Sequence, residues 1–249
     1  MSLRALDEQA GTTRERLVQA AADLLTEGGR EAVSTRAVSA AAGVQAPTLY
    51  RLFGDKEGLL DAVAAYGFEQ YLQDKQAVGT TDDPVEDLRR GWDVHVDFGL
   101  SQPAFYVLMY GDVRPGRVSR AAQDSVELLR GMVARVAAAG RLRMSVERAA
   151  RLVDAAARGL VMELISAPPQ ERDLDLSAIV RENTLRAIVT PGRPEPAGPA
   201  EQSDLPSRAV ALRAALDQHP TSSLTEAEQN LLVEWLDRLA DVPAPAGRR

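Results

Sequence analysis

Apolar residues recur at intervals of three and four along most of this chain, and glycine, proline and short polar runs break the intervals. This spacing is typical of helices that bury one face, and no segment shows the sustained alternation that strands require. The sequence therefore predicts an all-α protein. Helices are expected at residues 13–27, 35–42, 46–53, 56–73, 84–100, 104–110, 118–139, 145–166, 174–190, 209–217 and 225–241.

The second and third of these helices are separated by a very short turn. Ser34 can cap the first of the pair, and Gly43 can end it because glycine tolerates a left-handed backbone. Pro47 is acceptable in the first turn of the next helix, where its missing N–H needs no partner. Two helices that cross at a glycine-containing turn form a helix-turn-helix, a motif that lays its second helix in the major groove of DNA.

The second helix of this pair divides into an inner and an outer side. Leu49 and Phe53 lie four residues apart, so both are expected to face inward. The remaining residues combine polar, aromatic and basic groups, which suit phosphate oxygens and base edges. On or near the outer side we expect Gln45, Ala46, Pro47, Thr48, Tyr50 and Arg51.

From about residue 13 to residue 71, the chain resembles the DNA-binding domain of the TetR family of transcriptional repressors. The matching segments are the Ala41-Ala42-Gly43-Val44 turn, the Pro47-Thr48-Leu49-Tyr50 sequence, and Phe53 followed by Lys56-Glu57 and Leu59-Leu60. Three positions differ from the family pattern. Leu52 stands where histidine is frequent, Gln45 replaces the usual serine cap, and Ser39 replaces an alanine. These differences bear on which bases are read.

The resemblance implies a site for a double-stranded DNA operator. Its residues would be Arg36, Gln45, Ala46, Pro47, Thr48, Tyr50, Arg51 and Lys56. Arg36 is expected to reach a base edge or a phosphate, and the hydroxyls of Thr48 and Tyr50 are placed for phosphate contact. Ala46 and Pro47 offer apolar contact to a thymine methyl. Lys56 begins the next helix, where its ammonium can reach the DNA backbone, while Arg51 is open between a DNA contact and a solvated position.

Two later helices carry broad apolar bands. The band of residues 145–166 is rich in alanine, which lets two helices approach closely, and the band of residues 174–190 is bulkier. In the family, the last two helices of the core domain form a four-helix bundle with a second subunit. The resemblance thus implies a homodimer through these helices, with an ordinary core within one chain as the alternative.

The aromatic residues are few and unevenly placed, and five of the eleven lie between residues 92 and 110. Two elements lined in this way could enclose an apolar pocket together with residues from later helices, which is what a small-molecule effector requires. The candidate ligand-binding residues are Trp92, His95, Phe98, Phe105, Tyr106, Met109, Tyr110, Met132, Arg158 and Met162. The alternative for each of them is an ordinary core position, and for His95 a hydrogen-bonded core histidine.

Composition restricts the remaining classes of function. The chain has a net charge of −7, which argues against a general nucleic-acid coat, although residues 34–56 carry three cations and one acid. With no cysteine and two histidines, a disulfide, a metal site or a cofactor is not expected. No run is apolar and long enough to span a membrane, and catalytic motifs are absent, so we expect a cytoplasmic protein that is not an enzyme.

These observations predict a regulator with five segments. They are a disordered arm at 1–12, a helix-turn-helix domain at 13–54, a connecting helix with a ligand-binding and dimerisation domain at 55–190, a proline-rich linker at 191–203, and a helical extension at 204–249. The resemblance implies a repressor that a small molecule releases from a palindromic operator. An activator, or a helical ligand-binding or protein-interaction module with weak or lost DNA binding, are the alternatives.

Overall fold

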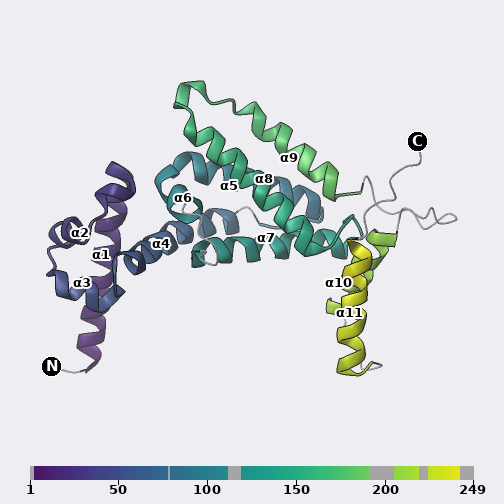
Figure 1. Cartoon of the computed structure of the whole chain (residues 1–249), viewed down its shortest axis with the longest axis horizontal. Helices are drawn as coiled ribbons and strands as arrows, with labels where there is room; N and C mark the ends of the chain where they lie inside the picture. Colours follow the sequence, from purple (N-terminus) through teal and green to yellow (C-terminus); the bar gives the residue numbers. More distant parts are fainter. Residues whose placement is uncertain (1–2, 78, 112–118, 191–204, 219–223, 242–249) are drawn as a thin grey trace. The chain divides into compact units, whose positions relative to one another are not determined.

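The computed structural model describes residues 3–77, 79–111, 119–190, 205–218 and 224–241, and these residues form helices joined by short connections (Figure 1). The described part of the chain contains no strand, so the predicted all-α fold is confirmed. The elements are α1 (Leu3–Ala32), α2 (Thr35–Ala42), α3 (Ala46–Phe53), α4 (Lys56–Ala77), α5 (Pro84–Ser101), α6 (Pro103–Tyr110), α7 (Arg120–Ala138), α8 (Val146–Ser166), η1 (Pro169–Glu171), α9 (Asp175–Ile188), α10 (Leu205–Gln218) and α11 (Glu226–Ala240).

The first helix differs most from the expected bounds. It begins at Leu3, whereas the sequence analysis placed a disordered arm at 1–12. Residues 3–10 are mostly leucine, alanine, arginine, glutamate and glutamine, which are good helix formers, so the helix extends beyond the amphipathic stretch. The expected stop at Gly28-Gly29 is present as a break, because Gly29 has φ 66° and ψ −169° inside the range of α1. The expected linker at 191–203 lies outside the described residues.

Several helix ends have the caps that the sequence predicted. The Ser34 side chain accepts a hydrogen bond from the Ala37 backbone N–H, 3.1 Å away, and Gly43 ends α2 in a left-handed conformation with φ 62°. Asp55 accepts from the Gly58 N–H at 2.8 Å and so caps α4. Thr225 and Glu228 form a full capping box at the start of α11. The side chains of Ser34, Asp55 and Thr225 accept from first-turn N–H groups that have no partner within the helix, which is why α2, α4 and α11 begin where they do.

The chain divides into two compact units, with α5 and α7 each shared between them. The first unit contains residues 1–79 and 94–125. Its core joins α1, α4 and α6 through fully buried residues such as Leu17, Leu59 and Tyr106. Gly67 allows the close contact between α4 and α6, because a Cβ at this position would lie 2.4 Å from Cδ1 of Phe105.

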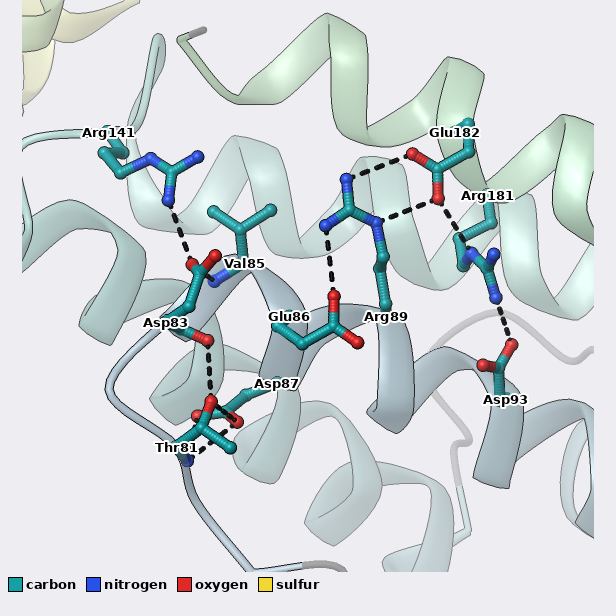
Figure 2. Close-up of polar contacts among 10 residues, drawn as sticks. All are labelled: Thr81, Asp83, Val85, Glu86, Asp87, Arg89, Asp93, Arg141, Arg181 and Glu182. Carbon is teal, nitrogen blue, oxygen red and sulfur yellow. Dashed lines mark hydrogen bonds and ion pairs between the residues drawn. The ribbon is translucent and has the colours of Figure 1, made fainter. Parts of the chain in front are cut away.

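The second unit contains residues 80–93 and 126–249, and arginine–carboxylate contacts tie its segments together (Figure 2). Arg89 in α5 binds both carboxylate oxygens of Glu182 in α9, at 3.0 and 3.2 Å. The buried carboxylate of Asp87 accepts hydrogen bonds from the Thr81 backbone N–H at 2.9 Å, from the Thr81 hydroxyl at 2.7 Å, and from Arg135 of α7. Although burial raises the pKa of Asp87, these hydrogen bonds outweigh it and hold the pKa below its ordinary value.

Candidate nucleic-acid interface

The helix-turn-helix is formed by α2, the turn at residues 43–45, and α3. Val38 and Leu49 are fully buried and hold the two helices against α1 and α4. The Gly43 N–H donates to the Ala40 carbonyl at 3.2 Å, and the Val44 N–H donates to the Ser39 carbonyl at 2.9 Å, so the turn is closed by the last carbonyls of α2. The packing of Leu49 fixes the rotation of α3, and the opposite side of α3 is therefore presented outward.

The predicted DNA-binding residues lie mostly on this outward side. Exposed positions are Arg36, Gln45, Ala46, Pro47, Tyr50 and Arg51, whereas Thr48 and Lys56 are half-buried. Tyr50 is 49% exposed, and its hydroxyl lies 3.5 Å from the Thr35 hydroxyl at the start of α2. Thr35 was not among the predicted site residues, because only the fold brings two hydroxyls that are fifteen positions apart next to each other.

Two arginines of α1 contact the helix-turn-helix. Arg16 donates a hydrogen bond to the Ala42 carbonyl at the end of α2, where a cation also complements the negative end of the helix dipole. The guanidinium carbon of Arg14 lies 5.2 Å from the centroid of the Phe53 ring, within cation–π range. Both residues therefore contact the motif itself, which the periodicity of α1 alone did not reveal.

A cavity of about 300 Å³ lies in the first unit, next to α1. Its apolar wall includes the rings of Tyr66, Phe98 and Phe105, and polar groups from α1 and the α5–α6 connection complete it. The lining residues are Gln19, Ala22, Asp23, Thr26, Tyr66, Gly67, Tyr71, Phe98, Ser101, Gln102 and Phe105.

Three of these polar groups form a hydrogen-bonded chain. The Tyr66 hydroxyl donates to Oε1 of Gln19 at 2.9 Å, and Nε2 of Gln19 donates to Oδ1 of Asp23 at 2.8 Å. The chain connects α4 to α1 and orients the Asp23 carboxylate at the cavity. Because Asp23 is the only acid or base in the lining apart from two tyrosines, the cavity favours a ligand with a donor or a positive charge.

The predicted ligand-binding residues are distributed over several places. Phe98 and Phe105 line the cavity. His95, Tyr106 and Tyr110 are buried in an aromatic cluster, in which Nε2 of His95 lies 2.8 Å from the Tyr106 hydroxyl. Burial also raises the pKa of Tyr71, whose ring lies 5.0 Å from that of Phe98. Met109 is buried in the same unit.

The other predicted ligand-binding residues belong to the second unit. The indole N–H of Trp92 donates to the Ser177 hydroxyl at 3.1 Å, and Trp92 is 4% exposed. Arg158 pairs with Asp154 at 2.7 Å along α8, while Met132 and Met162 are half-buried. Within the described residues, no group of three or more histidines and carboxylates is placed to hold a metal ion, and no helix is long and apolar enough to cross a membrane.

The interface and fold just described define a helix-turn-helix protein with a larger helical region. Residues 17–63 match the family described as bacterial regulatory proteins, tetR family. The helix-turn-helix region therefore matches the TetR family, and the chain has the fold of TetR-family transcription regulators. No curated protein sequence matches the chain significantly.

Solved structures agree with this fold over most of the chain. A TetR-family transcriptional regulator from Pectobacterium atrosepticum is 21% identical with a TM-score of 0.62, over 75% of this chain and 98% of that chain. A TetR-family transcriptional regulator from Streptomyces coelicolor is 26% identical with a TM-score of 0.54, over 71% and 95%. A fatty acid degradation regulator from Bacillus halodurans is 16% identical with a TM-score of 0.53, over 69% and 94%.

Proposed function

We propose that this protein is a homodimeric, DNA-binding transcription regulator, a repressor that a small molecule releases from a palindromic operator. The observation that carries the proposal is the rotation of α3. Leu49 is fully buried, whereas Gln45, Pro47, Tyr50 and Arg51 face solvent on a helix preceded by a closed turn. A helix held in this way can enter a major groove without unfolding any part of the domain.

Charge explains why two subunits are needed. The whole chain has a net charge of −7, and few cations lie near α3, so one subunit makes few phosphate contacts. Two linked helix-turn-helix domains, one from each subunit, bind the two halves of an operator with a much higher combined affinity than either domain alone. The ligand binds better when the spacing of the two helix-turn-helix domains does not fit the operator. It then lowers the affinity for DNA by the difference between its own affinities for the two spacings.

A surface on α8 and α9 supports the homodimer. Leu152 of α8 is 40% exposed and Ile179 of α9 is 57% exposed. Gly159 lies inside α8, where glycine costs about 1 kcal/mol relative to alanine, yet a Cβ at this position would meet no described residue of the same chain within 4 Å. Close approach of a second α8 supplies a reason for the glycine.

The dimer surface can be tested against a matched glycine. Gly131 in α7 is also exposed, inside a helix and free of neighbours within 4 Å. Gly159→Arg is expected to shift the protein toward monomer in sedimentation velocity, and Gly131→Arg to leave the mass unchanged. A dimer that tolerates Gly159→Arg would exclude this surface.

DNA binding is tested with duplexes from the region flanking the protein's own gene, by fluorescence anisotropy at several salt concentrations. The Tyr50→Ala/Lys56→Ala double variant should abolish specific binding, whereas Arg120→Ala, at an exposed arginine of α7, should not weaken it. Affinity that falls steeply with salt is expected, because bound counterions are released from the phosphates. Almost no binding at low salt would favour a helical ligand-binding or protein-interaction module instead, and intact specific binding by the double variant would contradict the assigned site.

The 300 Å³ cavity is the effector site in this proposal, since it has an aromatic wall and one oriented carboxylate, Asp23. Phenethylammonium should bind more tightly than phenylacetate, which has the same ring and opposite charge, in titrations followed by NMR. Ser101→Trp, which fills the cavity, should remove this binding. Val107→Trp, at an exposed position of α6 outside the lining, should retain it. Equal binding of the two probes would argue against a role for Asp23.

A further inference from the structure

The helices α10 and α11 form a hairpin with an apolar surface that the described residues of one chain leave uncovered. The two helices run antiparallel, since Ala209 and Val210 near the start of α10 are buried with Leu236 and Ala240 near the end of α11. Nε of Arg213 lies 3.9 Å from Oδ1 of Asp237 across the hairpin. The similar solved structures cover 69–75% of this chain but 94–98% of their own, so part of this chain has no counterpart in them.

Four large side chains of the hairpin are about half-exposed. Leu205 and Leu212 of α10 are 51% and 49% exposed, and Leu231 and Trp235 of α11 are 44% and 52% exposed. Leu205 and Leu212 are two turns apart, and Leu231 and Trp235 are one turn apart, so each pair lies along one stripe. Around the axis of each helix, the exposed stripe lies on the same side of the buried residues, about a third of a turn before them. Because the two helices are antiparallel, two stripes placed in this way lie on the same face of the hairpin. We call this face the hairpin face.

Charges at the two ends of the hairpin face are opposite. Arg208 is exposed at the end where α10 begins. Glu228, whose carboxylate also accepts from Thr225 in the capping box, is exposed near the loop end, where α11 begins. When a second copy packs face to face with its hairpin pointing the opposite way, its loop end lies above the start of α10 of the first copy. Arginine then lies near glutamate at both ends of the contact, with Trp235 and the leucines between them. An isologous interface requires this kind of self-complementarity.

We infer that the hairpin face binds the hairpin face of a second copy of this chain, forming a four-helix contact separate from the α8 and α9 surface. The inference builds on the proposed homodimer, because a first contact brings the two hairpins together at high effective concentration. One end of α11 is already anchored within its own chain. The Asp241 carboxylate accepts from the Ser145 N–H at 3.2 Å and from the Ser145 hydroxyl at 2.9 Å, at the N-terminus of α8.

The chain contains its own reporter for this contact. It has two tryptophans, of which Trp92 is 4% exposed and Trp235 is 52% exposed. In the full-length Trp92→Phe variant, Trp235 is the only source of tryptophan emission. Acrylamide quenching and the emission maximum are measured over a dilution series, with the fraction of dimer taken from sedimentation velocity at each concentration. A Gly159→Arg/Trp92→Phe variant supplies a further sample weakened at the α8 surface.

The inference expects quenching of Trp235 to fall, and its emission to move to shorter wavelength, in step with dimer formation. Equal quenching of Trp235 in monomer and dimer would overturn the inference. Shielding of Trp235 already in the monomer would also overturn it, since Trp235 would then be covered by its own chain. Shielding only when another protein or DNA is added would also overturn it.

Surface variants separate this contact from the proposed function. Leu231→Glu is expected to weaken dimerisation at least tenfold, and Leu128→Glu, at a leucine of α7 that is 39% exposed, to leave it unchanged. Far-ultraviolet circular dichroism checks that both variants are folded. If Leu231→Glu leaves the dimerisation constant unchanged, the hairpin contact is wrong while operator binding is unaffected. Loss of operator binding in the Tyr50→Ala/Lys56→Ala variant, by contrast, leaves Trp235 shielding intact.

Discussion

Different kinds of interaction stabilise the interior of each of the two units of this protein. The first has a core of aliphatic and aromatic groups, in which the ring centroids of Tyr71, Phe98 and Tyr106 lie 4.7–6.2 Å from those of neighbouring rings. The second has aliphatic helix contacts plus arginine–carboxylate pairs, which join α5 to α9 through Arg89 and Glu182 (Figure 2) and α5 to α7 through Asp87 and Arg135. Apolar packing depends on shape and is insensitive to pH, whereas paired carboxylates must stay ionised. The units should therefore respond to different perturbations.

The largest expected effect is at Asp87. Asp87→Asn removes a buried charge that accepts from Thr81 and pairs with Arg135, and we expect the second unit to lose about 2–3 kcal/mol. Tryptophan fluorescence in a urea titration measures this loss, and hydrogen exchange locates it in residues 80–93 and 126–138. Asp82→Asn, at an exposed neighbouring aspartate, should change stability by less than about 0.5 kcal/mol. Equal effects of the two variants would show that the tie is not needed.

The next effect belongs to the first unit. A Cβ at Gly67 would overlap the Phe105 ring, so Gly67→Ala should cost about 1–3 kcal/mol through displaced packing between α4 and α6. Gly131→Ala is the control, since its Cβ meets nothing and it should stabilise α7 by up to about 1 kcal/mol. Faster hydrogen exchange is expected in α4 and α6. An unchanged stability of Gly67→Ala would mean that Phe105 moves aside without cost.

A smaller effect is expected at Glu182, because its side chain is 35% exposed and its partner Arg89 is 33% exposed. Hydrogen bonds from Arg89 hold the pKa of Glu182 below its ordinary value, although water screens the pair. Glu182→Gln should therefore cost about 1 kcal/mol or less, and 1 M salt should reduce that cost. Urea titrations of the variant, with exposed Glu171→Gln as control, measure both. A cost that salt does not change would point to packing instead of charge.

The stability of the second unit is expected to fall gradually as the pH is lowered. The folded pKa values of Asp87 and Glu182 lie below those of the unfolded chain, about 3.9 and 4.3, so their stabilisation is present above this range and is lost as pH falls through the folded values. We expect little change from pH 7 to about 5, and then faster exchange in the second unit before the first. The difference between the native protein and Asp87→Asn should also shrink in acid. A difference that grows in acid would reverse the assigned sign.

Local signals in the sequence predicted much of the helix-turn-helix. Ser34, Gly43 and Asp55 act through their own backbone neighbours, so their roles as caps could be read from a few adjacent letters. The inward position of Leu49 follows from its spacing, and the outward position of Tyr50 and Arg51 follows from Leu49. By contrast, the start of α1 at Leu3 was missed, because helix propensity extends it where no apolar stripe does.

The cavity next to α1 could be predicted only in part from local patterns in the sequence. Phe98 and Phe105 line it, but Gln19 and Asp23 of α1 were not predicted, because no local pattern indicates which face of a distant helix closes a cavity. His95 and Trp92 were predicted for the same pocket, yet each has its hydrogen-bond partner elsewhere, in Tyr106 and Ser177.

The sequence by itself determined the helical class, most helix ends and the helix-turn-helix, since periodicity, caps and a short motif act over distances of a few residues. Only the tertiary structure decided the pairing of Arg89 with Glu182, the Gly67–Phe105 contact, and the approach of Arg213 to Asp237 between α10 and α11. These contacts join positions that are far apart in the chain. Their formation depends on how whole helices pack, which no single stretch of residues specifies.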